Sequence, residues 1–208
     1  MIASSLTGNP RRGVFAATGE TKGARTRDAI AETAISILRE SGFQALSVAA
    51  LADGAGIRRN SYYTHFEDLS TLINALSNQV LEDIGRRSVI ASAPHPASVL
   101  RLRMQYVLSL PVTDKAAATV VSELYVHHAE TAHEVHRRLA LDMAADRRRG
   151  LLSLTHSESR MAAIVIASGA MELLRTRHPN TRGEARQFLR LMARICGLLE
   201  TSSDSIDL

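Results

Sequence analysis

Residues 55–72 have the sequence AGIRRNSYYTHFEDLSTL, and this stretch decides the fold. Before it, Ser47 is a favourable N-cap for a short helix, and Gly54 and Gly56 end that helix. The segment RRNSYYTHF follows after no more than a tight turn, and Asp68 can cap the next helix. An earlier helix is predicted over residues 26–42, where apolar residues recur at helical spacing. Short helices joined by such tight turns predict a helix-turn-helix.

The second helix of this pair carries the residues predicted to contact DNA. In a helix-turn-helix it enters the major groove with its N-terminal residues against the base edges. Arginine can bond bidentately to guanine, asparagine to adenine, and an aromatic ring can cover a thymine methyl group. The predicted DNA-binding residues of this pair of helices are Ser47, Arg58, Arg59, Asn60, Ser61, Tyr62, Tyr63 and His65, the last two as phosphate contacts. The alternative places Tyr63 and Phe66 in the core and leaves the arginines solvated, and for Phe66 we expect the core position.

The excess positive charge of the chain lies at its beginning. Residues 1–27 hold five basic residues and one acidic residue, a net charge of +4, and the remaining 20 basic and 20 acidic residues cancel. Glycines recur between threonines and serines here, so residues 1–24 are interpreted as a basic flexible arm. The arm is either a solvated tail or a segment that neutralises DNA phosphates. In the second case, Lys22, Arg25 and Arg27 join the DNA-binding set.

The rest of the chain predicts one helix after another. Helices are expected over residues 97–110, 114–149 with a break near 127–131, 158–175 and 183–200, and no segment alternates with the period of a strand. The fold class is therefore all-α. We expect an arm over 1–24, a helix-turn-helix domain over 25–70, and a larger helical domain over 71–208. A single cysteine excludes an internal disulfide, and no apolar run reaches membrane-spanning length, so a cytoplasmic protein without a membrane partner is expected.

The stretch also resembles a known signature. It is similar to that of TetR-type transcriptional regulators, approximately A-G-V-S-x-G-x-[LIV]-Y-x-[HY]-F-x-[SD]-K-x-x-L. The similarity extends over residues 26–73. The matching positions are Ala55, Gly56, Ile57, Ser61, Tyr63, His65, Phe66, Asp68 and Leu72. The resemblance implies a DNA-binding regulator, most specifically a repressor.

Three positions depart from the signature. Arg58 stands where the signature has a serine that caps the helix. Asn60 stands at the position of its frequent glycine, and Leu69 stands at the position of its lysine. A cation at a helix N-terminus opposes the helix dipole and forgoes the cap, each costing about 1 kcal/mol. Nearby phosphate would compensate for this arginine, and the basic arm is expected to substitute for the missing lysine.

The resemblance further implies a homodimer that pairs through its last two helices and binds a pseudo-palindromic operator. Apolar and small residues on these helices form matching faces. The predicted interface residues are Met161, Ile164, Val165, Ser168, Met171, Phe188, Met192, Ile195 and Leu199. The alternative, which does not exclude the first, is that these side chains form the core within one chain.

A small-molecule effector is the remaining implied partner, and it would bind between the middle helices and release the DNA. The candidate wall residues are Met104, Tyr106, Leu108, Leu124, Tyr125, His128 and Met143. Core packing explains the apolar members equally well. No cofactor is expected.

Two other classes of function stay open. Residues 127–136 hold four of the eight histidines, and His133 and His136 can share a helix face with Glu130. We expect solvated histidines and no metal site, because the zinc-protease motif needs one more residue between its histidines. A metal- or histidine-dependent helical enzyme and a helical adaptor with a vestigial helix-turn-helix are the alternatives; the prediction is that the protein is not an enzyme.

Overall fold

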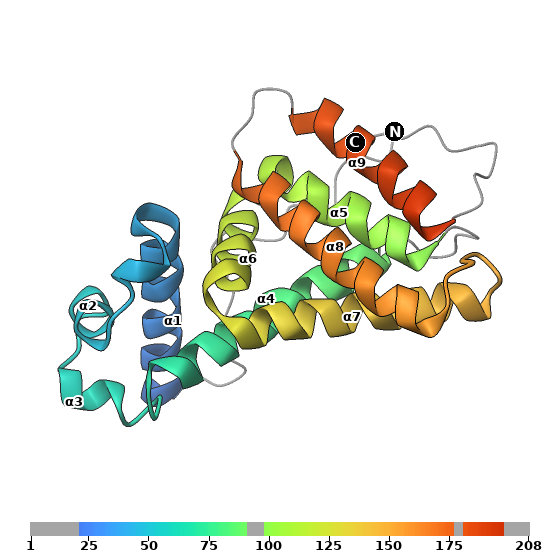
Figure 1. Ribbon diagram of the computed structural model, residues 1–208. Coiled ribbons are helices and arrows are strands. Elements are labelled where there is room, and N and C mark those ends of the chain that lie inside the picture. Colours follow the sequence, from blue (N-terminus) through green and yellow to red (C-terminus); the bar gives the residue numbers. More distant parts are fainter. Residues whose placement is uncertain (1–20, 91–97, 177–180, 198–208) are drawn as a thin grey trace, which may run out of the picture. The chain divides into compact units, whose positions relative to one another are not determined.

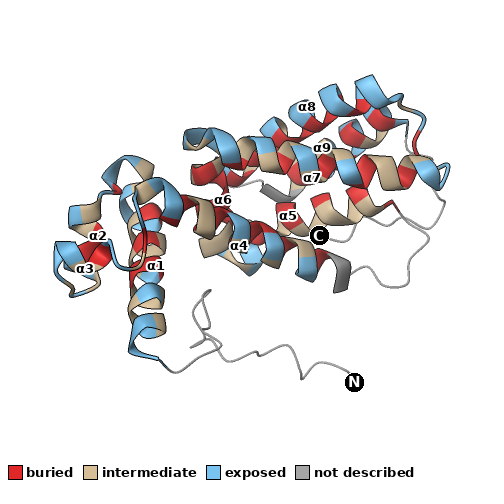
Figure 2. Cartoon of the chain, turned by 90° about the horizontal axis from the view of Figure 1, so that it is seen from below, coloured by how far each residue is buried: buried red, intermediate tan, exposed pale blue. Residues whose placement is uncertain are grey.

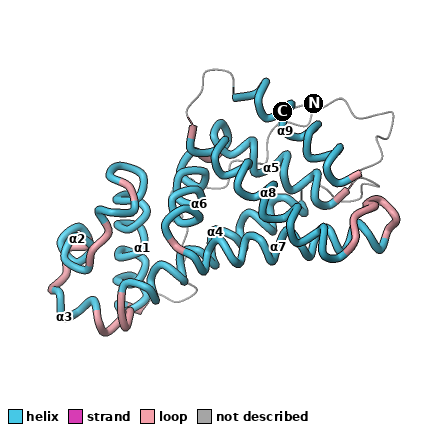
Figure 3. Tube along the Cα trace, in the orientation of Figure 1, coloured by secondary structure: helices cyan, strands magenta, loops and turns pink. Residues whose placement is uncertain are grey.

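The computed structural model describes residues 21–90, 98–176 and 181–197. Every regular element in these ranges is a helix, and none is a strand, which confirms the all-α fold class (Figures 1 and 3). The chain divides into two compact units, Met1–Gln79 and Val80–Leu208. The division falls inside one helix, α4 (Leu69–Ile90), rather than at residue 70 as predicted. A continuous helix, which has no turn signal near its middle, therefore connects the two units.

The first helix of unit 1, α1 (Lys22–Ser41), begins earlier than the sequence pattern indicated. The Thr21 hydroxyl accepts a hydrogen bond from the Ala24 amide at 3.3 Å and caps the helix. Residues 22–24 are therefore helical and not part of an irregular arm, because a good N-cap outweighs a single glycine in the first turn. The helix ends at Gly42, whose φ of 77° places it in the left-handed region.

Helices α2 (Val48–Gly54) and α3 (Arg59–Tyr62) form the predicted pair, preceded by the short 3₁₀ helix η1 (Phe43–Ala45). The Ser47 hydroxyl caps α2 by accepting from the Ala50 amide at 3.2 Å. Helix α2 lies close against α1, since a Cβ atom at Gly54 would come within 2.6 Å of a Thr33 methyl carbon. The Asp68 carboxylate accepts from the Thr71 amide at 2.6 Å, so it caps α4 as predicted.

In its described residues, unit 2 combines the second half of α4 with five further helices. These are α5 (Val99–Thr113), α6 (Lys115–His127), α7 (Ala129–Arg148), α8 (His156–Arg175) and α9 (Thr181–Cys196). The predicted break near 127–131 is confirmed, because α6 ends at His127 and α7 starts two residues later. Helix α8 packs against α5, α6, α7 and α9. Helices α7, α8 and α9 present buried and exposed stripes, whereas α5 is buried or half-buried along most of its length (Figure 2). In the described part of the chain, no helix combines the length and apolarity needed to span a membrane.

Two buried carboxylates of α7 hold unit 2 together. Asp146 is completely buried and accepts hydrogen bonds from the Ser98 hydroxyl at 2.6 Å and from the first amides of α5. Asp142 forms a two-pronged ion pair with Arg103, whose guanidinium also donates to the Ser88 hydroxyl at 3.1 Å. Burial raises the pKa of Asp142, although Arg103 acts in the opposite direction. These contacts connect α4, α5 and α7.

Candidate nucleic-acid interface

The first turn of α3 carries three exposed polar side chains, those of Arg58, Arg59 and Asn60. Arg58 occupies the N-cap position with extended backbone, and its side chain makes no capping hydrogen bond. Its carbonyl accepts from the Ser61 amide at 2.8 Å, which closes the first turn. One exposed turn therefore holds the backbone N–H groups of the helix start, the guanidinium groups of Arg58 and Arg59, and the carboxamide of Asn60. All of these groups can hydrogen-bond to phosphates or to base edges.

Tyr62 does not belong to this surface, and its predicted role as a base contact is wrong. Its side chain has 0% exposure, and its hydroxyl donates to the Asp68 carbonyl at 3.1 Å. Burial, followed by the charge of Asp68, raises the pKa of Tyr62 to about 12. It also contacts Phe66, with ring centroids 5.8 Å apart. The signal was present in the sequence, because Tyr62 occupies the aliphatic position of the TetR-type signature.

Its neighbour Tyr63 is 53% exposed, so the alternative that placed Tyr63 in the core is excluded. Phe66 has 1% exposure and confirms the expected core position. The rings of Tyr62 and Tyr63 meet edge to face at 5.6 Å, which fixes the base of the exposed ring against the buried one. Ser61 and His65 are half-buried. One tyrosine thus anchors α3, and the other remains available at the surface.

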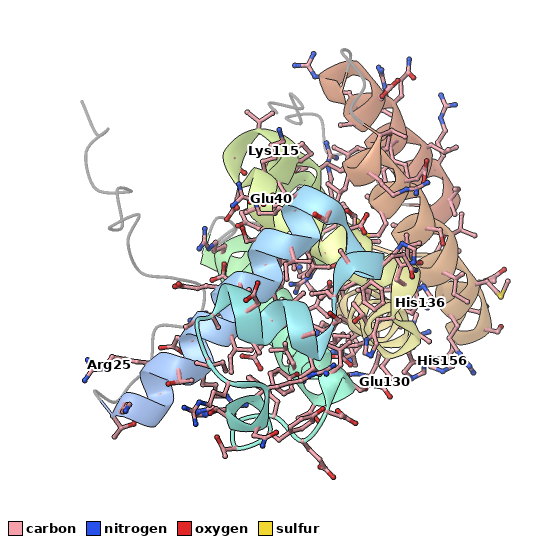
Figure 4. All side chains as sticks on the ribbon, turned by 90° about the vertical axis from the view of Figure 1, so that its left-hand side faces the viewer. Arg25, Glu40, Lys115, Glu130, His136 and His156 are labelled. Atoms are coloured by element: carbon pink, nitrogen blue, oxygen red, sulfur yellow. The ribbon has the colours of Figure 1, made fainter. Side chains whose placement is uncertain are left out.

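The start of α1 lies beside the end of α3. The Arg27 guanidinium stacks 4.5 Å from the centroid of Phe66 and donates to the His65 carbonyl at 3.2 Å. A Cβ atom at Gly23 would lie 3.9 Å from a ring carbon of His65. Lys22 and Arg25 are exposed on the same first turns, and Arg25 projects away from the helix (Figure 4). Arg27 is therefore a positioning residue of this unit, while Lys22 and Arg25 extend its basic surface.

Ser47 is exposed, and its hydroxyl oxygen accepts the capping hydrogen bond of α2. The hydroxyl hydrogen therefore stays available to donate to a phosphate oxygen. The remaining arm residues, 1–20, lie outside the described residues. Of the five basic residues counted at the beginning of the chain, three are consequently helical: Lys22, Arg25 and Arg27.

The candidate effector-binding residues occupy the interior of unit 2. Met104, Leu108, Leu124 and Met143 are buried core side chains. The three polar candidates are half-buried. Tyr125 contacts His136 Nε2 at 2.8 Å and Ser168 Oγ at 3.0 Å, and His128 Nδ1 lies 2.9 Å from Thr131 Oγ1. Tyr106 lies near Arg87, and burial raises the pKa of its hydroxyl. Their role as pocket walls stays a prediction.

The predicted dimer face is divided by the structure into exposed and buried residues. Met161, Val165 and Ile195 are 63%, 54% and 40% exposed, and Ile164 and Ser168 are exposed beside them. Met171 and Met192 are 5% and 1% exposed. Those two side chains fill the core within the chain, which favours the core alternative for them, and their part in a dimer interface stays a prediction. Leu199 lies outside the described residues.

Helix α9 adds one apolar residue that the sequence analysis did not include. Leu191 is 54% exposed, and it lies three residues after Phe188 and four before Ile195, a spacing that shares one helix face. Phe188 packs tightly on α8, because a Cβ atom at Gly169 would lie 2.6 Å from its ring. The exposed apolar residues of α8 and α9 therefore flank a close contact between these helices.

Three of the four histidines of residues 127–136 contact other side chains: His127 lies 4.0 Å from Glu123, His128 lies near Thr131 and Glu130, and His136 contacts Tyr125, whereas His133 is exposed. His136 meets Tyr125 through its ring and Nε2, and burial together with His133 lowers the pKa of His136. Among the described residues, no group of three His, Cys, Asp or Glu side chains is arranged to hold a metal ion.

Comparison with known proteins shows which proteins this chain resembles. The chain is 28% identical over 113 residues to the HTH-type transcriptional regulator AcrR of Shigella flexneri. The match spans about half of both proteins, 53% of this chain and 52% of that relative. No protein-family model matches the chain.

Solved structures match over most of the chain. A TetR-family transcriptional regulator from Rhodococcus sp. covers 82% of this chain and 98% of its own, with 18% identity and a TM-score of 0.62. The multidrug binding protein EbrR, solved in complex with imidazole, covers 86% and 98%, with 19% identity and a TM-score of 0.63. The chain thus has the fold of TetR-family regulators, which confirms the resemblance seen in residues 26–73. AcrR and the Rhodococcus protein are both named transcriptional regulators.

Proposed function

We propose that the protein is a sequence-specific DNA-binding transcriptional regulator acting in the cytoplasm, in particular a homodimeric repressor of a pseudo-palindromic operator. The observation that carries this proposal is the exposed first turn of α3. Arg58, Arg59 and Asn60 are solvent-accessible there, on a helix anchored from beneath by Tyr62. An uncapped helix start with two arginines is unfavourable in isolation and becomes favourable beside phosphate.

The dimer part of the proposal is supported by the apolar residues of α8 and α9 that one chain leaves exposed. Met161, Val165 and Leu191 are each more than half exposed, which is costly for a surface that stays in water. A two-fold pairing through this face would bury them and present two copies of α3 to successive major grooves.

The effector part of the proposal rests on fold similarity. EbrR, which shares the fold, is a multidrug binding protein solved with imidazole. By linkage, an effector that weakens operator binding must itself bind more weakly in the presence of the operator, by the same factor. Tyr106, Tyr125 and His128 supply the polar groups of the candidate pocket.

The basic beginning of the chain is proposed to strengthen this binding without base recognition. Residues 1–20 carry two arginines and one glutamate, so most of the positive excess of residues 1–27 lies in the first turns of α1, at residues 22–27. Replacing Lys22 and Arg25 by glutamine should make the slope of log K against log salt shallower by about 2, and deleting residues 2–20 by a similar or smaller amount. Slopes that stay equal to the wild-type slope would contradict a phosphate role.

The proposed function is tested by selecting bound sequences from a random duplex pool at near-physiological salt. Enrichment of an inverted repeat is the expected result. The variant Arg58→Ala/Arg59→Ala should lose the enrichment, whereas Arg148→Ala/Arg160→Ala, which removes two exposed arginines of unit 2, should retain it. If the α3 variant selects the same repeat as the wild type, Arg58 and Arg59 do not read the operator. If the wild type enriches no repeat, the specific-regulator proposal fails and the adaptor alternative is favoured.

A further inference from the structure

Helix α9 carries a row of arginines at one-turn spacing. Arg186, Arg190 and Arg194 follow one another at intervals of four residues, and all three are exposed. Side chains at this spacing lie on one helix face about 6 Å apart. These three residues are called the α9 arginine row.

The other helices of unit 2 neutralise many of their arginines with their own carboxylates. Asp83 pairs with Arg86 and Arg87, Glu134 with Arg137 and Arg138, Asp146 with Arg149, and Glu172 with Arg175. Helix α9 holds one acidic residue, Glu184, which lies two residues before Arg186 and therefore on another face. Like charges one turn apart repel each other, so the row destabilises its own helix.

The helices packed against α9 do not compensate for this charge. Helix α5 contains no acidic residue in its sequence. Helix α8 contains Glu158, which completes a capping box with Thr155, and Glu172, which pairs with Arg175. No ion pair joins the α9 arginine row to a carboxylate among the described residues. The row is thus an uncompensated cationic surface.

The row also stays accessible in the proposed dimer. Successive residues of a helix are rotated by about 100°, so Arg190 lies about 100° and Arg186 about 140° around the helix from Leu191. The exposed apolar residues Leu191 and Ile195 lie on the flank that the dimer would cover. Pairing through that flank leaves Arg186 and Arg190 on another side of α9, whereas Arg194, three residues after Leu191, borders it.

We propose that the α9 arginine row binds the phosphate backbone of double-stranded DNA, separately from α3. From the first to the last arginine the row extends about 12 Å, which corresponds to about three phosphates along one strand. A guanidinium matches the oxygens of a phosphate in a bidentate geometry. A polymer with evenly spaced negative charges therefore fits an evenly spaced row, and the release of its condensed counterions drives the contact. The contact carries no base recognition.

The test uses the full chain with α3 neutralised by Arg58→Ala/Arg59→Ala, so that the row is measured apart from the proposed operator contact. In this background, Arg186→Gln/Arg190→Gln/Arg194→Gln is compared with the matched control Arg86→Gln/Arg137→Gln/Arg175→Gln. The control removes the same charge from arginines that have carboxylate partners. Affinity for a duplex of random sequence is measured between 50 and 200 mM salt, and circular dichroism verifies that each variant is folded.

The row variant should show a slope of log K against log salt that is shallower by about 2 to 3, and the control should keep the slope of its background. Equal slopes for the two triple variants would overturn the proposal. Polyglutamate that binds the row as tightly as the duplex at equal charge would also overturn it and would assign the row to an acidic protein partner. Neither result bears on α3, because operator selection by the wild type tests α3 independently.

Discussion

The hydroxyl of Tyr62 donates a hydrogen bond to the backbone carbonyl of Asp68 at 3.1 Å, and the Asp68 carboxylate caps α4. This contact fixes the short helix α3 to the start of the helix that follows it. A helix of four residues has no stability of its own, so its orientation depends on such anchors.

Replacing Tyr62 by phenylalanine removes the hydroxyl donor and leaves the ring in place. The expected loss in the free energy of unfolding is about 0.5–1.5 kcal/mol. Tyr62→Ala should cost about 3–5 kcal/mol, because it also empties a fully buried site. Urea unfolding measures both, with the exposed Tyr63→Phe as the control. A Tyr62→Phe variant as stable as the wild type would show that the hydrogen bond is not stabilising.

The close contact between α8 and α9 predicts the effect of Gly169→Ala. The added methyl carbon would lie 2.6 Å from the Phe188 ring, so the ring must shift. Overpacking of this kind costs about 1–3 kcal/mol, partly offset by up to about 1 kcal/mol of improved helix propensity. Thermal unfolding of Gly169→Ala, Phe188→Leu and the double variant measures the coupling. The double variant should be more stable than the sum of the single effects; strict additivity would contradict the clash.

The exposed face of α8 predicts that a charge there prevents dimerisation. Val165→Glu should shift the protein to a monomer, because a dimer would have to bury an unpaired carboxylate. The control is Leu141→Glu, since Leu141 is similarly exposed on α7, 55% against 54% for Val165. Sedimentation equilibrium reports the mass of each. A Val165→Glu dimer of wild-type affinity would exclude this face as the interface.

The hydrogen bonds of Glu134 predict that the folded protein loses part of its stability in acid. Hydrogen bonds from Arg137, then from Arg138, lower the pKa of this carboxyl group from 4.5 to about 2 in the folded chain. A lowered pKa stabilises the fold above the unfolded value of 4.5, and the contribution is lost as the pH falls towards 2. The stability difference between the wild type and Glu134→Gln should therefore shrink between these pH values. Urea titrations at pH 7 and pH 3 check this, and a constant difference would contradict the ion pairs.

The helical character of the chain and its first unit could be predicted from local signals. Capping residues such as Ser47 and Asp68, and the left-handed turn at Gly56, act within a few residues of their own positions. The same signals locate the exposed turn at Arg58 and Arg59. Local signals are misleading at the start of α1, where glycines favour an irregular arm and the Thr21 cap starts the helix at Lys22.

The assignment of residues to surface or core required the tertiary structure. Tyr62 and Tyr63 are adjacent and chemically identical, yet one is fully buried and the other is half exposed. Met171 and Met161 lie on the same apolar helix, and only Met161 faces solvent. Hydrophobic spacing shows that a face is apolar, but it does not show whether the same chain or another one covers it.

By itself, the sequence determined the all-α fold, the helix-turn-helix and its exposed arginines, because caps, turns and periodicity are local properties of the chain. Only the tertiary structure decided that Tyr62 is an anchor, that Arg27 stacks on Phe66, and that Asp142 meets Arg103. Asp142 and Arg103, for example, are separated by 39 residues in sequence. Their meeting depends on how whole helices pack, which no local pattern specifies.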